Sequence, residues 1–297
     1  MNVLVTGGAG FIGSNLVEAL IDEHDVTVLD NFHTGSVDNL AKVKDEVNII
    51  ERSCNDVLSL DISPDVIFHL GIPSSSPMYK DNPFLTGDAI NGMVSIMELA
   101  KRSESKKVVF AASSSVYNGL PTPHCEDMEV LVTDYYTEAR LAIERIAQLY
   151  KTLYGIDYAG LRFFSVYGPH EDAKGSFANM VTQFLWEMKK GNAPVIFGDG
   201  GQTRDFIFVE DVVKALIIGS KKGTGIFNVG TGVSHSFNDV VEILNDKLGL
   251  EIDPIYVKNP IGNYVAHTQA DISKMNTLGF NSIYSLEEGI LKLLRMV

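Results

Sequence analysis

The sequence predicts an α/β fold in which a doubly wound parallel sheet is joined to a smaller, mostly helical C-terminal part. Two observations lead to this prediction. Short apolar runs alternate with helix-length amphipathic segments through the first half of the chain, and glycine-rich loops around single helices replace them after residue 167. The chain has 297 residues, 45% of them hydrophobic, and is therefore long enough to bury the core of such a fold.

The first half supplies the strands and helices of the sheet. Helices are expected at 12–20, where apolar residues recur on one face, and at 86–103 and 134–154. Parallel strands joined by helices connect through right-handed crossovers, so we expect helices on both faces of the sheet. The predicted strands are the apolar or β-branched runs at 2–5, 26–29, 66–70, 108–112 and 159–164.

The second half predicts a separate, smaller part. Glycines and prolines mark loops around a helix at 177–190. We expect residues 1–166, together with about 204–230, to form a cofactor domain, and residues 167–203 and 231–297 to form a cap that contributes a substrate wall. The remaining expected elements are strands at 207–209 and 227–229 and helices at 236–248 and 285–296.

Charge and cysteine content exclude several classes of protein. Lys and Arg number 24 and Asp and Glu 38, which gives a net charge of −14 and argues against nucleic-acid or anionic-membrane partners. Cys54 and Cys125 are too few for a disulfide framework, and no apolar run reaches the roughly 18 residues of a membrane span. The histidines are scattered without metal-ligand spacing. We therefore expect a soluble, cytoplasmic protein without a metal site.

The motif TGGAGFIG lies between the first predicted strand and the first helix. Gly7 permits a tight turn, Gly10 lets the backbone approach a pyrophosphate, and Gly13 lets the helix pack on the sheet. Asp30 ends the second strand about twenty residues later, where a carboxylate accepts hydrogen bonds from an adenosine ribose. Residues 31–51 contain no arginine to hold a 2′-phosphate. The sequence therefore predicts a Rossmann site for NAD rather than NADP.

A second group of residues indicates proton and hydride chemistry. Tyr136 and Arg140 are four residues apart and so share a helix face. A free tyrosine has a pKa of about 10, and a nearby cation stabilises its phenolate. A serine from the run 113–115, directly after a strand, could relay a proton in the same pocket. These groups suit removal of a hydroxyl proton while a hydride leaves the same carbon, although they could also be only a serine-rich strand end and an amphipathic helix.

Taken in order, the motifs resemble the extended short-chain dehydrogenase/reductases, the NAD-dependent sugar-nucleotide epimerases and dehydratases. The resemblance covers essentially the whole chain and first suggests the activity of a UDP-glucose 4-epimerase. That activity is epimerisation at C4 of a nucleotide sugar (UDP-glucose/UDP-galactose type) through a transient 4-keto intermediate. The matching stretches are 6–13, 28–32 with Thr34-Gly35, His69-Leu70, Asn91, 113–117, Tyr136 with its cation, 162–169, 197–200, 202–206 and 270–274.

The resemblance implies roles for particular residues. It makes Ser113, Tyr136 and Arg140 catalytic. Family members are usually homodimers, in which helices 86–103 and 134–154 would form a four-helix bundle with those of the partner. The implied substrate-binding residues are Ser113, Ser165, Asn179, Ile196, Phe197 and, for the diphosphate, Arg204. The cofactor-binding residues are Gly7, Gly10, Phe11, Ile12, Gly13, Asp30, Asn31, Ser53, Cys54, Leu70, Gly71, Ile72, Asn91, Ala111, Tyr136, Arg140 and Phe163.

The chain also departs from the family pattern. Arg140 stands where a lysine is usual, and arginine keeps the charge without the compact ammonium geometry. Ser53 replaces an adenine-binding aspartate, Ser165 replaces a substrate-contacting asparagine, and Pro260 falls where a second phosphate-binding arginine often occurs.

The same pattern separates the reactions of the family. Dehydratases add an Asp-Glu pair after the catalytic hydroxyl, where this chain has Ser114-Ser115. UDP-glucuronate decarboxylases, which segment 73–83 resembles, usually carry a glutamate at the position of Ser115. Epimerisation needs no further acid or base and is the leading hypothesis. A decarboxylase or another nucleotide-sugar-modifying member of the family, and a non-catalytic NAD-binding sensor or scaffold, are the alternatives.

Overall fold

Seven parallel strands form the central sheet of the computed structural model, which describes residues 1–131, 134–259 and 264–296. The strands are β1 (Asn2–Thr6), β2 (Asp25–Asp30), β3 (Asn48–Glu51), β4 (Val66–His69), β5 (Lys107–Ser113), β6 (Tyr158–Phe163) and β11 (Gly225–Val229). Their order is β11-β6-β5-β4-β1-β2-β3, so the chain winds outward from β1 on one side and then from β4 on the other. This arrangement confirms the predicted doubly wound sheet, with its reversal between β1 and β4.

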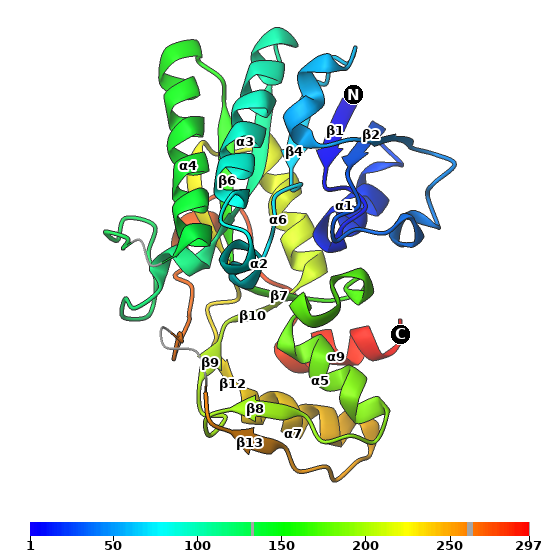
Figure 1. Cartoon of the computed structure of the whole chain (residues 1–297), viewed down its shortest axis with the longest axis vertical. Helices are drawn as coiled ribbons and strands as arrows, with labels where there is room; N and C mark the ends of the chain where they lie inside the picture. The colour runs from blue at the N-terminus through cyan, green and yellow to red at the C-terminus, as the bar shows by residue number, and fades with distance from the viewer. Residues whose placement is uncertain (132–133, 260–263, 297) are drawn as a thin grey trace.

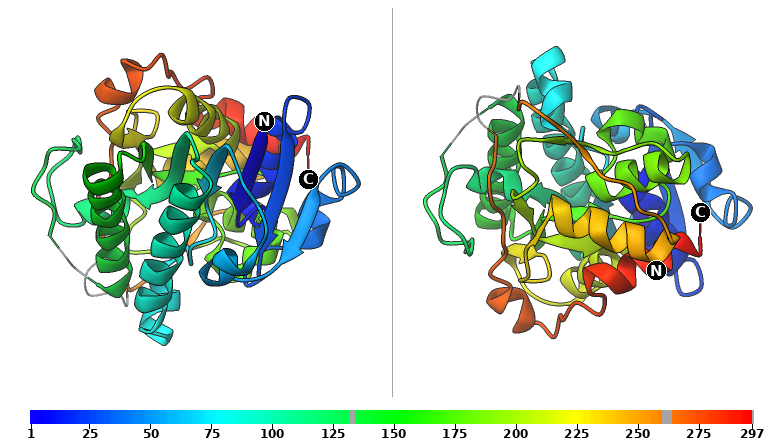
Figure 2. Two further views of the ribbon diagram at one scale, coloured as in Figure 1. Left: turned by 90° about the horizontal axis from the view of Figure 1, so that it is seen from above. Right: turned by 90° about the horizontal axis from the view of Figure 1, so that it is seen from below.

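Helices cover both faces of the sheet (Figures 1 and 2). On one face, α1 (Phe11–Leu20) and α6 (Val209–Lys221) share a buried core with the sheet, and on the other, α3 (Leu85–Arg102) and α4 (Tyr135–Tyr154) pack side by side. No helix in the described ranges combines the length and the apolar composition that crossing a bilayer requires. The short helices of this half are η1 (Val37–Leu40), η2 (Cys54–Ser59), α2 (Ser76–Asp81) and η3 (Ser114–Tyr117).

The C-terminal elements form a second layer below the sheet in Figure 1, around a core of their own that contains Phe184, Phe206 and Phe237. Three two-stranded sheets join these elements: β10–β7, β12–β9 and β13–β8. The strands are β7 (Ser165–Tyr167), β8 (Val195–Phe197), β9 (Thr203–Arg204), β10 (Phe206–Phe208), β12 (His235–Ser236) and β13 (Ile255–Val257). The helices are η4 (Asp172–Phe177), α5 (Met180–Lys189), α7 (Phe237–Leu248), α8 (Ser273–Asn276) and α9 (Leu286–Leu294).

The structure differs from the predicted elements at several places. The strand expected at 207–209 is β10, and Val209 instead begins α6, which the sequence analysis did not predict. Edge strand β3 was also not predicted, because its only apolar residues are Ile49 and Ile50. The predicted two-part division stays a prediction. Met275 and Phe280, which the sequence assigned to the cap, pack into the core that the sheet shares with α1 and α6.

A buried ion pair joins helix α4 to strand β6. The Arg162 guanidinium donates to both carboxylate oxygens of Glu144 at 2.9 and 2.7 Å, and to the Tyr117 hydroxyl at 2.7 Å. The side chains of Arg162 and Glu144 are only 6% and 8% exposed. Removal of one partner would therefore leave a charge buried without compensation.

We predict that Glu144→Gln lowers the free energy of unfolding by about 3 kcal/mol, because Arg162 then lacks its counter-charge. Urea unfolding followed by circular dichroism measures the change. The control is Glu187→Gln, which breaks an exposed pair with Lys190 and should leave the unfolding midpoint unchanged. Equal midpoints for Glu144→Gln and the wild type would contradict the prediction.

Candidate active site

The glycine turn after β1 leaves no room for side chains. Gly7 has a φ of +68°, and a Cβ there would lie 2.6 Å from the Gly71 amide nitrogen. A Cβ on Gly13 would lie 2.0 Å from the Gly7 carbonyl oxygen. Helix α1 begins directly after Gly10, and the first-turn amides of a helix have no partners within the helix. The turn therefore has the shape and the donors that a pyrophosphate requires.

Asp30 is fixed at the carboxyl end of β2. Its carboxylate accepts hydrogen bonds from the amides of Ala9 at 2.9 Å and Phe32 at 2.8 Å. Burial raises the pKa of Asp30, while the hydrogen bonds from backbone amides act in the opposite direction. A carboxylate has acceptor positions beyond these two, so Asp30 can also accept hydrogen bonds from ribose hydroxyls.

One cleft runs from the glycine turn, past the end of β5, to the segment that follows β7. An adjoining pocket shares Asp30, Asn31, Gly71 and other residues with it and adds Ser53 and Cys54. Burial raises the pKa of Cys54 to about 11, so this thiol stays protonated at neutral pH. The predicted residues that line the main cleft are Gly7, Gly10, Phe11, Ile12, Gly13, Asp30, Asn31, Leu70, Gly71, Ile72, Ala111, Ser113, Tyr136, Arg140, Phe163, Ser165 and Asn179.

Two hydroxyl groups meet inside this cleft. The Tyr136 hydroxyl donates to Ser113 Oγ at 3.1 Å, and Ser113 Oγ also accepts from the Ser115 amide at 3.2 Å. Ser113 is the last residue of β5, and Tyr136 lies in the first turn of α4. That turn is fixed by Asp134, whose carboxylate caps the helix by accepting from the Thr137 amide at 2.8 Å. Strand end and helix start therefore place the two hydroxyls together.

Arg140 lies beside Tyr136 and bonds to the main chain. Its Cζ is 4.9 Å from the centroid of the Tyr136 ring. The guanidinium donates to the carbonyl oxygens of Ala111 at 2.6 Å and Pro73 at 2.8 Å. The side chain thus supplies a positive charge next to the tyrosine, and it also ties the segment after β4 to strand β5.

The structure does not place Asn91 at the cleft. Asn91 is exposed on α3, and the residues of this helix that line the adjoining pocket are Leu85, Asp88 and Ala89. Asn91 is three residues after Asp88, about 60° away around the helix axis, so the helical period alone does not explain why Asn91 is absent from the pocket lining. The position of Asn91 was predicted from a motif match alone.

Three of the predicted substrate-binding residues lie on β8 and β9 rather than among the described cleft residues. Ile196 is 1% exposed and packs in the core of the C-terminal elements, because alternate side chains of β8 point inward. Its neighbour Phe197 is 37% exposed. The Arg204 guanidinium donates to the carbonyl oxygens of Thr203 and Val265, both at 2.7 Å. Pro260 lies outside the described residues.

Two cations at the clefts were not predicted. Lys174 lines the main cleft from η4, a segment whose sequence showed only loop-forming glycines and proline. Arg52 lines the adjoining pocket beside Asp30 and Asn31, and it directly follows the arginine-free stretch 31–51. Position in the fold, rather than any local motif, brings both residues to the site.

Comparison with known proteins identifies the family. Residues 3–230 match the NAD dependent epimerase/dehydratase family, and the chain belongs to this family of extended short-chain dehydrogenase/reductases. A putative UDP-glucose 4-epimerase of Methanocaldococcus jannaschii is 35% identical over 97% of this chain and 95% of its own length.

Two solved structures are similar over 99% of this chain. One is a UDP-N-acetylglucosamine 4-epimerase from Methanobrevibacter ruminantium in complex with UDP-N-acetylmuramic acid, with a TM-score of 0.93, 32% identity and 97% of its chain covered. The other is a UDP-glucose 4-epimerase from Thermotoga maritima with UDP-glucose, with a TM-score of 0.93, 32% identity and 98% of its chain covered.

NAD is the cofactor of this chain, as the sequence predicted. The glycine turn, in which Gly7 and Gly13 exclude a Cβ, fits its diphosphate, and the fixed carboxylate of Asp30 fits its adenosine ribose.

We predict that Gly13→Ala abolishes measurable NAD binding, because its Cβ would collide with the Gly7 carbonyl and displace the start of α1. Gly87→Ala in α3 is the matched control, since nothing lies within 4 Å of its Cβ and alanine favours a helix. Titration calorimetry with NAD⁺ measures both variants. Wild-type affinity in Gly13→Ala would contradict the proposed role of the turn.

Proposed function

We propose that this protein is an NAD-dependent epimerase that inverts C4 of a nucleotide sugar of the UDP-glucose/UDP-galactose type. The observation that carries the proposal is the 3.1 Å hydrogen bond from Tyr136 to Ser113 inside the cleft that holds the glycine turn. This geometry allows one hydroxyl pair to exchange a proton with a sugar hydroxyl close to a hydride acceptor. The similarity to 4-epimerases supports the choice among the reactions of the family.

The proposed reaction uses the two hydroxyls in sequence. Ser113 hydrogen-bonds the oxygen of the sugar 4-hydroxyl and relays its proton to Tyr136. Tyr136 accepts the proton as its phenolate. Arg140 places a positive charge 4.9 Å from the centroid of the tyrosine ring. The glycine turn and Asp30 would hold NAD, which would supply the acceptor and donor of the C4 hydride. Tyr136 then gives the proton back to the oxygen of the sugar, which has turned to present its other face.

The residues after Ser113 favour epimerisation over elimination or decarboxylation. Ser114 and Ser115 both line the cleft where an additional acid or base would have to stand. Serine has neither the charge nor the pKa to serve as a carboxylate does. Inversion at C4 needs only the Tyr136–Ser113 pair and an anchored nucleotide, since binding energy at the diphosphate holds the ligand while the sugar turns.

We predict that Tyr136→Phe lowers kcat by about 10²- to 10⁴-fold, because the phenyl ring cannot exchange a proton. NAD⁺ affinity should change little. Tyr135→Phe is the matched control: Tyr135 is the preceding residue, is 54% exposed, and should keep full activity. NMR of the sugar anomeric protons, with UDP-glucose and UDP-galactose as substrates, measures turnover.

The same assay separates the alternatives. UDP-glucose, UDP-galactose, their N-acetyl forms and UDP-glucuronate are each supplied with NAD⁺. Interconversion at C4 supports the proposal, whereas UDP-xylose formed from UDP-glucuronate would identify a decarboxylase. Turnover of none of these sugars, with NAD⁺ still bound, would favour the non-catalytic sensor and contradict the proposal.

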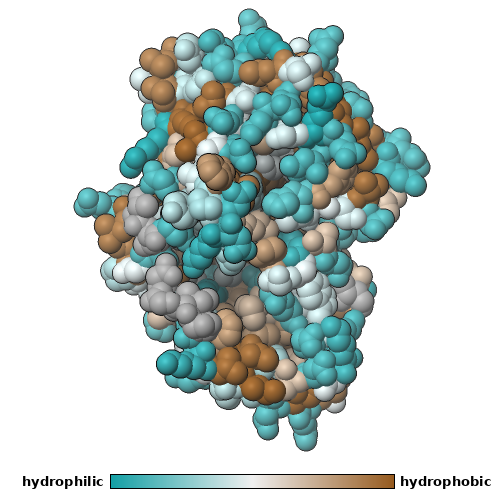
Figure 3. All heavy atoms as spheres, in the orientation of Figure 1, coloured by the Kyte–Doolittle hydropathy of each residue, from teal (hydrophilic) through white to brown (hydrophobic). Residues whose placement is uncertain are grey.

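We further propose that the chain forms a homodimer through α3 and α4. These helices pack against each other, and apolar residues gather over α4 at the upper left of Figure 3. Leu149 and Leu153 are four residues apart on α4 and are 51% and 59% exposed, next to Tyr154 at 50%. An exposed apolar stripe of this kind on a helix is typical of a helix-bundle interface.

We predict that Leu149→Glu with Leu153→Glu converts the protein to a monomer, because two charges would be buried at the interface. Sedimentation velocity measures the mass. Ile283→Glu, at a residue that is 61% exposed outside these helices, is the control and should not change the assembly. A wild-type monomer, or a dimer that survives both substitutions, would rule out this interface.

A further inference from the structure

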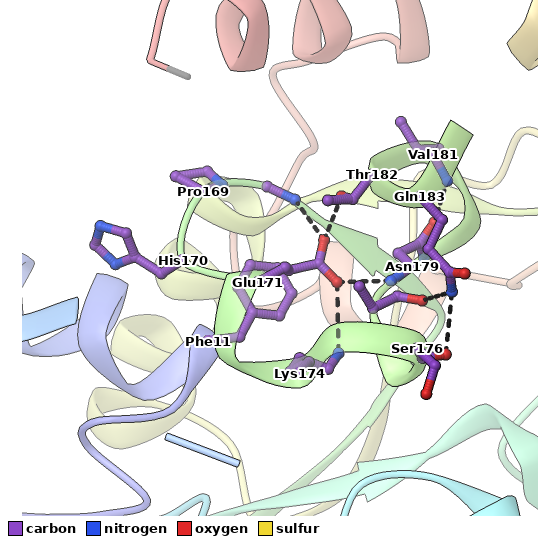
Figure 4. Close-up of polar contacts among 12 residues, drawn as sticks. Phe11, Pro169, His170, Glu171, Lys174, Ser176, Asn179, Val181, Thr182 and Gln183 are labelled. Carbon is purple, nitrogen blue, oxygen red and sulfur yellow. Dashed lines mark hydrogen bonds and ion pairs between the residues drawn. The ribbon is translucent and has the colours of Figure 1, made fainter. Parts of the chain in front are cut away.

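The segment between β7 and α5 is fixed by the buried carboxylate of Glu171 (Figure 4). Oε2 accepts from the Asn179 amide at 2.7 Å, and Oε1 accepts from the Gly168 amide at 3.2 Å and the Thr182 hydroxyl at 2.6 Å. Glu171 is 1% exposed, and burial raises its pKa. One carboxylate therefore holds both ends of the segment and the first turns of α5.

Glu171 also orients Lys174, which lies on the same segment. Lys174 Nζ is 3.5 Å from Oε2 of Glu171, and it stands 5.1 Å from the centroid of the Phe11 ring. Phe11 is the first residue of α1, directly after the glycine turn. The Lys174 side chain is 16% exposed and lines the same cleft as Gly10 and Tyr136. Its ammonium thus lies near the N-terminus of α1, at the cleft.

Few described cations are placed to balance the phosphates that this cleft must hold. NAD has a diphosphate, and so does the nucleotide sugar of the proposed function. The guanidinium groups of Arg140 and Arg204 donate to main-chain carbonyls. Lys174 has three N–H donors, of which one is directed at Glu171, so two further donors can face a ligand.

Stabilisation of Glu171 alone does not account for the position of Lys174. Three uncharged donors, from Gly168, Asn179 and Thr182, already bind the carboxylate at 2.6 to 3.2 Å. The lysine contact is longer, at 3.5 Å, than the 2.7–2.9 Å typical of a charge-assisted hydrogen bond. The ammonium is therefore held near the carboxylate without being fully engaged by it.

We propose that Lys174 binds a diphosphate in the cleft and that Glu171 is the positioning residue that directs its ammonium there. The diphosphate is that of NAD or that of the nucleotide sugar, and the second case rests on the proposed function. Lys174 would then supply part of the charge that a protein of net charge −14 needs at this site.

Ligand binding to the full chain tests the proposal without requiring turnover. Lys174→Gln removes the charge, and Lys190→Gln is the matched control at a lysine whose side chain is 63% exposed on the surface. Titration calorimetry measures the affinity for NAD⁺, AMP, UDP and UMP. We expect Lys174→Gln to weaken NAD⁺ or UDP by about tenfold, as the loss of a charged hydrogen bond implies, and to affect the corresponding monophosphate less. Lys190→Gln should bind as the wild type does.

The ligand that weakens identifies the source of the diphosphate: NAD⁺ for the cofactor, UDP for the substrate. Unchanged affinity of Lys174→Gln for both NAD⁺ and UDP would overturn the proposal. Because arginine keeps the charge, an equal loss of affinity in Lys174→Arg and Lys174→Gln would overturn it too. Glu171→Gln should reproduce the loss and, unlike Lys174→Gln, lower Tm. Wild-type affinity in Glu171→Gln would overturn its positioning role. An absence of sugar turnover would count against the proposed function and would leave these binding results standing.

Discussion

The contact between the turns that follow β1 and β4 is the constraint on which the rest of this structure depends. Gly7 and Gly71 approach so closely that a Cβ on either would clash with the backbone of the other turn. Their approach fixes the reversal point of the sheet, and α1 starts from it with its N-terminal amides facing the cleft. The ends of β2 and β5, with Asp30 and Ser113, lie on either side of this point. The glycine turn of the cofactor site and the Tyr136–Ser113 hydroxyl pair thus follow from one packing arrangement.

The proposed active site is assembled from elements far apart in the sequence. Ser113 ends a strand, Tyr136 starts a helix, and the loop carrying Glu171 and Lys174 belongs to the C-terminal half. Local contacts hold them: the Ser115 amide donates to Ser113 Oγ, the Asp134 cap fixes the helix turn of Tyr136, and Lys174 lies 3.5 Å from the buried carboxylate of Glu171. Rigid supports of this kind are what proton transfer over hydrogen-bond distances requires.

The sequence was most informative where a pattern has one physical cause. Alternating strands and helices predicted the sheet, and the glycine spacing predicted the turn, because only glycine fits at Gly7 and Gly13. Asn91 and Ile196 were placed by motif alone: Asn91 is exposed on α3, and strand periodicity turns the Ile196 side chain into the core. Lys174 was not predicted, because the Glu171 contacts with Gly168, Asn179 and Thr182 that shape its segment do not form a recognisable sequence motif. Helix α6 was missed because its first residue, Val209, continues the apolar run of β10.

Arg140 links two parts of the main chain in addition to placing a positive charge beside Tyr136. By bonding to Pro73 on one side and Ala111 on the other, it acts as a cross-brace between two neighbouring strand ends. The two strand ends cannot move apart here without breaking at least one hydrogen bond to the charged guanidinium. This separation of the two strand ends therefore sets the width of the cleft beside Tyr136.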